Sequence, residues 1–168
     1  MYTTYNDEDS VKKRLYGDRL VLSGRALIIL GIWSSIKAII IFYLALPQIL
    51  EFVHEGDVAQ EENVRIIKLF SMAIFVVMVA IVFLFHLFIG RSAMKNGYGK
   101  KRTTFYLVLT VLVIISTIAS DVQIVMEGFD IIDLASMVVD LTVVYACCDI
   151  LYSAIKLRTI EKKTEERV

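Results

Sequence analysis

The sequence predicts an all-α integral membrane protein with four transmembrane helices in an up-and-down antiparallel bundle. Hydrophobic residue types make up 57% of the 168 residues, compared with roughly 45–50% in soluble domains. The 18 basic and 18 acidic residues balance to a net charge of zero, but they are concentrated between long apolar runs. Four of these runs reach the length of about 20 residues that a helix needs to cross a bilayer.

The four apolar runs define the predicted spans in chain order. The third run is short and rich in Val and Ile, a composition that favours a strand in water. Inside a bilayer an isolated segment must satisfy its own backbone hydrogen bonds, so we expect a helix there as well. The first run ends at Pro47. The spans cover residues 26–46, 66–90, 103–121 and 131–155, which together form one transmembrane domain over residues 26–155.

Two charged flanks complete the chain. Residues 1–25 form an N-terminal flank, in which residues 9–23 show the pattern of a short amphipathic helix on the inner membrane surface. A solvated lead-in to the first span explains the same residues equally well. Residues 156–168 form a charged tail, and we expect the fourth span to continue into it as a helix.

The basic residues predict the orientation of the chain. Of the 18, 15 lie in the N-terminal flank, in the loop between the second and third spans, or in the C-terminal tail. Because Lys and Arg accumulate in cytoplasmic loops, both termini are predicted to be cytoplasmic, with the protein in the plasma membrane. The opposite segments, 47–68 and 121–133, carry nine acids and two bases. This excess would attract cations, or it simply reflects the absence of bases from outer loops.

Ionisable residues within the spans are candidate functional residues, because charges inside a bilayer are costly and rare. Lys37 lies near the middle of the first span and Asp140 near the middle of the fourth. The helical rise of 1.5 Å per residue places them at depths that differ by roughly 3 Å, which predicts an ion pair. His86 and Asp149 lie at similar depth in the inner leaflet and form a second predicted pair.

Further polar and small residues line these predicted pairs. Thr110 and Thr117 are seven residues apart, so they lie on one face of the third span. Small residues at four-residue spacing surround Lys37 and would let a partner helix approach closely. These small residues are Gly31, Ser34, Ser35 and Ala38.

Several classes of chemistry lack a motif in this sequence. Cys147 and Cys148 are adjacent, so they cannot supply a C-x-x-C pair. A haem held by two histidines would need a partner for His86, but His54 lies in an outer loop. There is no nucleotide-binding or hydrolase motif and no excess of positive charge for nucleic acid. We therefore expect no enzyme activity, no metal, no cofactor and no nucleic-acid partner.

Two functions fit the predicted spans. The first is a transporter or channel for an ion or small polar solute, with the charged residues and threonines along its path. The second is a non-enzymatic scaffold or accessory subunit whose buried charges hold helices together. Four helices leave little room for an internal path, so we expect a homo-oligomer, most simply a dimer.

Overall fold

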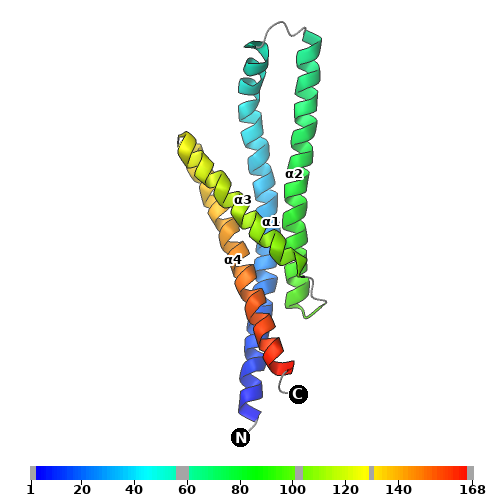
Figure 1. Cartoon of the computed structure of the whole chain (residues 1–168), viewed down its shortest axis with the longest axis vertical. Helices are drawn as coiled ribbons and strands as arrows, with labels where there is room; N and C mark the ends of the chain where they lie inside the picture. Colours follow the sequence, from blue (N-terminus) through cyan, green and yellow to red (C-terminus); the bar gives the residue numbers. More distant parts are fainter. Residues whose placement is uncertain (1–2, 56–60, 101–103, 129–130, 166–168) are drawn as a thin grey trace. The chain divides into compact units, whose positions relative to one another are not determined.

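The computed structural model describes residues 3–55, 61–100, 104–128 and 131–165, which contain four α-helices (Figure 1). These are α1 (Thr3–Glu55), α2 (Glu61–Gly97), α3 (Phe105–Glu127) and α4 (Ile131–Glu165). Each contains a segment that is long and apolar enough to cross a membrane. The prediction of four helices with the length and composition of membrane spans is confirmed, while their orientation stays a prediction.

The helices extend beyond the predicted spans. α1 runs through Pro47 to Glu55, so the proline does not end the helix. Membrane helices tolerate proline because other groups can satisfy the backbone carbonyl that it leaves unbonded. No helix boundary separates residues 9–23 from the first span, because they form the early turns of α1. α4 continues to Glu165, which confirms the predicted helical extension into the charged tail.

The chain divides into two compact units. The first unit contains Met1–Leu30 and Phe85–Val168, and the second contains Gly31–Leu84. In the first unit α3 and α4 pack against each other and lie side by side in Figure 1. Its apolar core draws residues from all four helices: Leu20, Leu27, Ile89, Ala93, Tyr106, Val143, Ala146, Cys147, Ile150, Ala154 and Leu157.

Within the first unit, α1 and α2 approach each other closely at two pairs of glycines. A Cβ atom on Gly24 would lie 2.7 Å from the carbonyl oxygen of Gly90, and one on Gly97 would lie 2.5 Å from that of Gly17. The two glycines of each helix are seven residues apart, so they lie on one helical face. The absence of side chains at these four positions therefore permits the backbones to touch.

The second unit exposes much of its apolar surface. Ile40, Phe70 and Val76 are each more than half exposed, as expected of side chains that face lipid. The rings of Phe42 and Phe75 stack with their centroids 3.9 Å apart, which joins the α1 and α2 segments of this unit.

Candidate functional site

Buried polar side chains gather on α3 and α4, the two packed helices of the first unit. Asp140 of α4 and Asp121 of α3 are 8% and 7% exposed. Ser136, one turn before Asp140, and Thr110 of α3 are also buried. All four lie in segments apolar enough to cross a membrane. Among the buried polar residues of the α3–α4 pair, these four supply two carboxyl groups and two hydroxyl groups.

Asp140 and Thr110 were predicted as site residues from the sequence, whereas Asp121 and Ser136 were not. Asp121 marks the predicted end of the third span, where an exposed acid is ordinary. In the structure α3 continues to Glu127, six residues further, so Asp121 belongs to the helix interior. Asp121, Thr117 and Thr110 are spaced four and seven residues apart, which places them on one face of α3. This shared face is the feature of the sequence that points to Asp121 as a companion of the two threonines.

Two hydroxyl groups of α3 make hydrogen bonds, one within the helix and one to α2. Thr110 Oγ1 donates a hydrogen bond to the carbonyl oxygen of Tyr106 at 2.7 Å. Thr117 is half-buried, seven residues further along the same helix. The phenol of Tyr106 accepts a hydrogen bond from Asn96 Nδ2 at 2.8 Å, with both residues buried. This second bond ties the start of α3 to the end of α2.

Asp149 makes its contacts with α1. Its Oδ1 lies 3.4 Å from Nε of Arg19, and its Oδ2 accepts a hydrogen bond from Ser23 Oγ at 2.5 Å. The Asp149 side chain is 13% exposed, and that of Arg19 is 48% exposed. This three-residue contact links α1 to α4. Arg19 had been assigned to the flank from the sequence, so its role here was missed.

His86 is buried, with 5% of its surface exposed, near the end of α2. The contacts of Asp149 with Arg19 and Ser23 lend no support to the predicted pairing of His86 with Asp149. That pairing stays a prediction.

Lys37 belongs to the second unit, where it is half-buried. The small residues predicted around it are buried at Gly31 and half-buried at Ser34, Ser35 and Ala38. Ser35 Oγ donates to the carbonyl oxygen of Gly31 at 2.8 Å, so this hydroxyl is used within α1. The predicted pairing of Lys37 with Asp140 concerns residues of different units and stays a prediction.

Further ion pairs, hydrogen bonds and ring contacts join the helices of the first unit. Lys13 Nζ of α1 lies 3.3 Å from Oε1 of Glu161 in α4, and Glu161 is buried. Arg25 donates to the hydroxyl of Tyr98 at 3.1 Å, which joins α1 to the residues that follow α2. The rings of Tyr16 and Tyr152 meet edge to face, with centroids 6.1 Å apart.

The described residues contain no cluster of three or more His, Cys, Asp or Glu side chains that could hold a metal ion. Cys147 is buried and Cys148 is exposed, both as free thiols. Comparisons with protein-family models, with curated proteins and with solved structures find no match.

Proposed function

We propose that this protein transports cations or protons across the membrane, with Asp140 as the central intramembrane group. The observation that carries the proposal is the burial of Asp140 and Asp121, with Ser136 and Thr110, on packed helices long and apolar enough to span a bilayer. The protein would act in the plasma membrane, with both termini in the cytoplasm.

The cost of burying such groups argues for a function. A charged side chain at the centre of a bilayer costs at least about 2.5–3.5 kcal/mol, and intramembrane acids commonly mark ion pathways and proton relays. Carboxylate and hydroxyl oxygens can replace the hydration of a cation, and carboxylates can also exchange protons. The α3–α4 pair supplies both kinds of oxygen.

Each predicted residue has a role in this proposal. Asp140 receives the cation or proton, and Thr110 and Thr117 line the way to it. Lys37 opposes cation passage unless a carboxylate neutralises it. His86, which the sequence places in the inner leaflet, would carry the proton there. We assign Asp149 to the contact between α1 and α4, because both of its oxygens are engaged there.

The second candidate is a scaffold or accessory subunit. The contacts of Asp149 with Arg19 and of Glu161 with Lys13 favour it, because ionisable side chains already join helices in this protein. In this reading Lys37 and Asp140 serve the same purpose, within one chain or towards a partner helix.

Flux through purified protein in liposomes distinguishes the two candidates. Transport predicts a pH-dependent cation or proton flux that rises with the amount of protein, and its loss in Lys37→Met. If the protein is a scaffold or accessory subunit, Lys37→Met should lower its yield or thermal stability, while the activity of each folded molecule is unchanged. Wild-type liposomes that match protein-free liposomes at every pH would contradict transport.

A further inference from the structure

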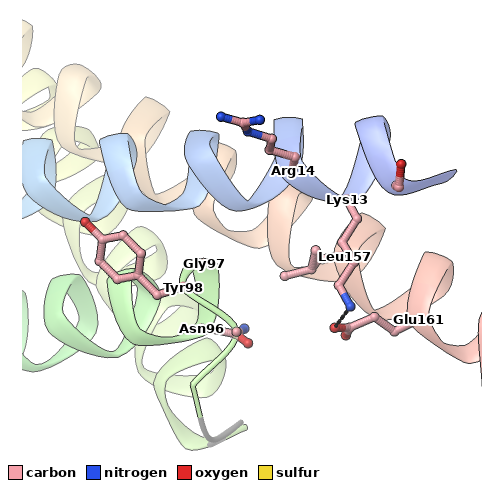
Figure 2. A pocket seen from close by; sticks show the side chains of 9 residues that line it. Lys13, Arg14, Asn96, Gly97, Tyr98, Leu157 and Glu161 are labelled. Atoms are coloured by element: carbon pink, nitrogen blue, oxygen red, sulfur yellow. Dashed lines mark ion pairs between the residues drawn. The ribbon is translucent and has the colours of Figure 1, made fainter. Parts of the chain in front are cut away.

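A cavity of about 290 Å³ opens within the first unit, and its lining residue nearest to Asp140 in the chain, Leu157, lies 17 residues further along α4. Three segments line it: the start of α1, the residues around the end of α2, and the last turns of α4 (Figure 2). The lining includes Lys13, Arg14, Asn96, Gly99, Leu157 and Glu161.

An ion pair positions one cation in the wall of this cavity. Figure 2 shows Lys13 reaching from α1 towards Glu161 on α4. Nζ of Lys13 lies 3.3 Å from Oε1 of Glu161. Glu161 is only 8% exposed, so its contact with the ammonium group restricts where Lys13 can point. An ammonium group has three N–H donors. The carboxylate oxygen at 3.3 Å takes one, which leaves donors for a ligand.

The other lining residues suit a small polar ligand. Arg14 follows Lys13 in the chain and belongs to the lining, but in Figure 2 its guanidinium is directed away from the ion pair. Leu157 supplies an apolar wall between the helices, and Asn96 lies at the end of α2. With one carboxylate against two cations, the charged side chains of the lining sum to one positive charge.

We propose that this cavity binds the phosphate group of a small phosphate ester. Lysine and arginine are the side chains that most often hold phosphate, through charge-assisted hydrogen bonds. The volume lies at the lower end of the roughly 300–1,000 Å³ found for small-molecule pockets, so the ester is small.

The position of the cavity along α2 indicates how a phosphate reaches it. Asn96 and Gly99 follow the predicted end of the second span at Gly90 by six and nine residues. At 1.5 Å per helical residue, Asn96 lies about 9 Å beyond the second predicted span, but Leu157 follows the end of the fourth by two residues, or about 3 Å. A soluble phosphate ester and a lipid headgroup at the membrane surface can therefore both reach the cavity. The proposal is independent of transport through Asp140.

Two binding measurements on the full chain in phosphatidylcholine nanodiscs separate these sources. The first titrates glycerol 3-phosphate by calorimetry, with glycerol as the uncharged counterpart. The second adds phosphatidylinositol phosphate to the nanodiscs and measures the lipid retained by native mass spectrometry. Binding in the first indicates a soluble ester, and binding in the second alone indicates a headgroup. A wild-type protein that binds neither probe overturns the proposal.

Matched variants test whether the cavity is the site. Lys13→Gln/Glu161→Gln leaves the net charge unchanged but removes the positioned ammonium, and we expect about tenfold weaker binding. Arg14→Gln removes the second, exposed cation of the lining and should weaken binding by a smaller factor. Arg91→Gln, an exposed residue in the same unit outside the cavity, makes the same charge change. Equal losses in Arg14→Gln and Arg91→Gln, or no loss in the double variant, contradict the assignment.

Discussion

At the scale of single residues, acids in the helices occupy two kinds of environment. Asp149 and Glu161 each contact a basic residue of α1, at 3.4 Å and 3.3 Å. Asp121 and Asp140 are as buried as Glu161, and Asp140 lies nearer the middle of the predicted fourth span than Asp149 or Glu161. We propose that the first pair of acids holds helices together and that Asp140 serves transport because of its depth in the span.

Asp149→Asn tests the first half of this division. The substitution removes the charge that attracts Arg19 but keeps an oxygen that can accept from Ser23. Because Arg19 is half exposed and solvent screens the pair, the expected loss of stability is about 1 kcal/mol. Thermal unfolding in detergent measures it. In the double variant with Arg19→Gln, the combined loss should be smaller than the sum of the two single losses, and simple additivity would contradict the contact.

At the scale of helices, the glycines set how closely α1 and α2 pack. Gly24 and Gly90 face each other, as do Gly17 and Gly97, and each pair brings backbone atoms together. Two pairs separated by two helical turns make the contact continuous along the helices rather than a single crossing point. This contact positions the part of α1 that carries Arg19 and Ser23.

Gly24→Ala tests the close approach of α1 and α2. Alanine favours an unconstrained helix over glycine by roughly 1 kcal/mol, so without a neighbour the change would stabilise. Here the new Cβ would lie 2.7 Å from the carbonyl oxygen of Gly90, a backbone atom that cannot rotate away. We expect a net loss of about 1–2 kcal/mol in thermal unfolding. Ala80→Val, on the exposed surface of α2, should leave stability near wild type; an increase in stability for Gly24→Ala would contradict the packing.

Hydropathy and length were enough to predict the four helices from the sequence, because a bilayer admits few alternatives to a helix. The glycine contact was not predicted, since Gly17 and Gly97 lie outside the apolar runs where small residues draw attention. The contact of Asp149 with Arg19 was missed for a related reason: depth along the membrane normal does not reveal which neighbouring helix a side chain faces. Asp140 and Thr110 are candidates from the sequence because polarity inside a span is itself a signal, and their role stays a prediction.

At the scale of the whole molecule, the distribution of charge predicts the topology. Basic residues flank the two ends of the chain and the loop after α2, and acids dominate the two remaining connections. This pattern predicts cytoplasmic termini. A reporter that is active only in the cytoplasm, fused after Val168, should be active, and a fusion at residue 58 should be silent. Activity of the second fusion alone would contradict the predicted orientation.

The proposed dimer is a second property of the whole molecule. A path for a cation between two copies of a four-helix chain needs no wide lumen within one copy. Mass measurement in mild detergent should therefore give two chains per particle. The proportion of dimer should fall only on dilution to low protein concentration. A single monomeric species throughout would contradict the dimer, and any path would then lie within one chain.

The most direct test of transport through Asp140 compares two acids of the same helix. Asp140→Asn and Asp149→Asn are reconstituted at equal folded amounts, and the cation or proton flux per molecule is measured across an imposed gradient. We predict that Asp140→Asn falls to the level of protein-free liposomes, whereas Asp149→Asn, although less stable, retains flux close to wild type. Wild-type flux in Asp140→Asn would contradict the proposed role of this residue.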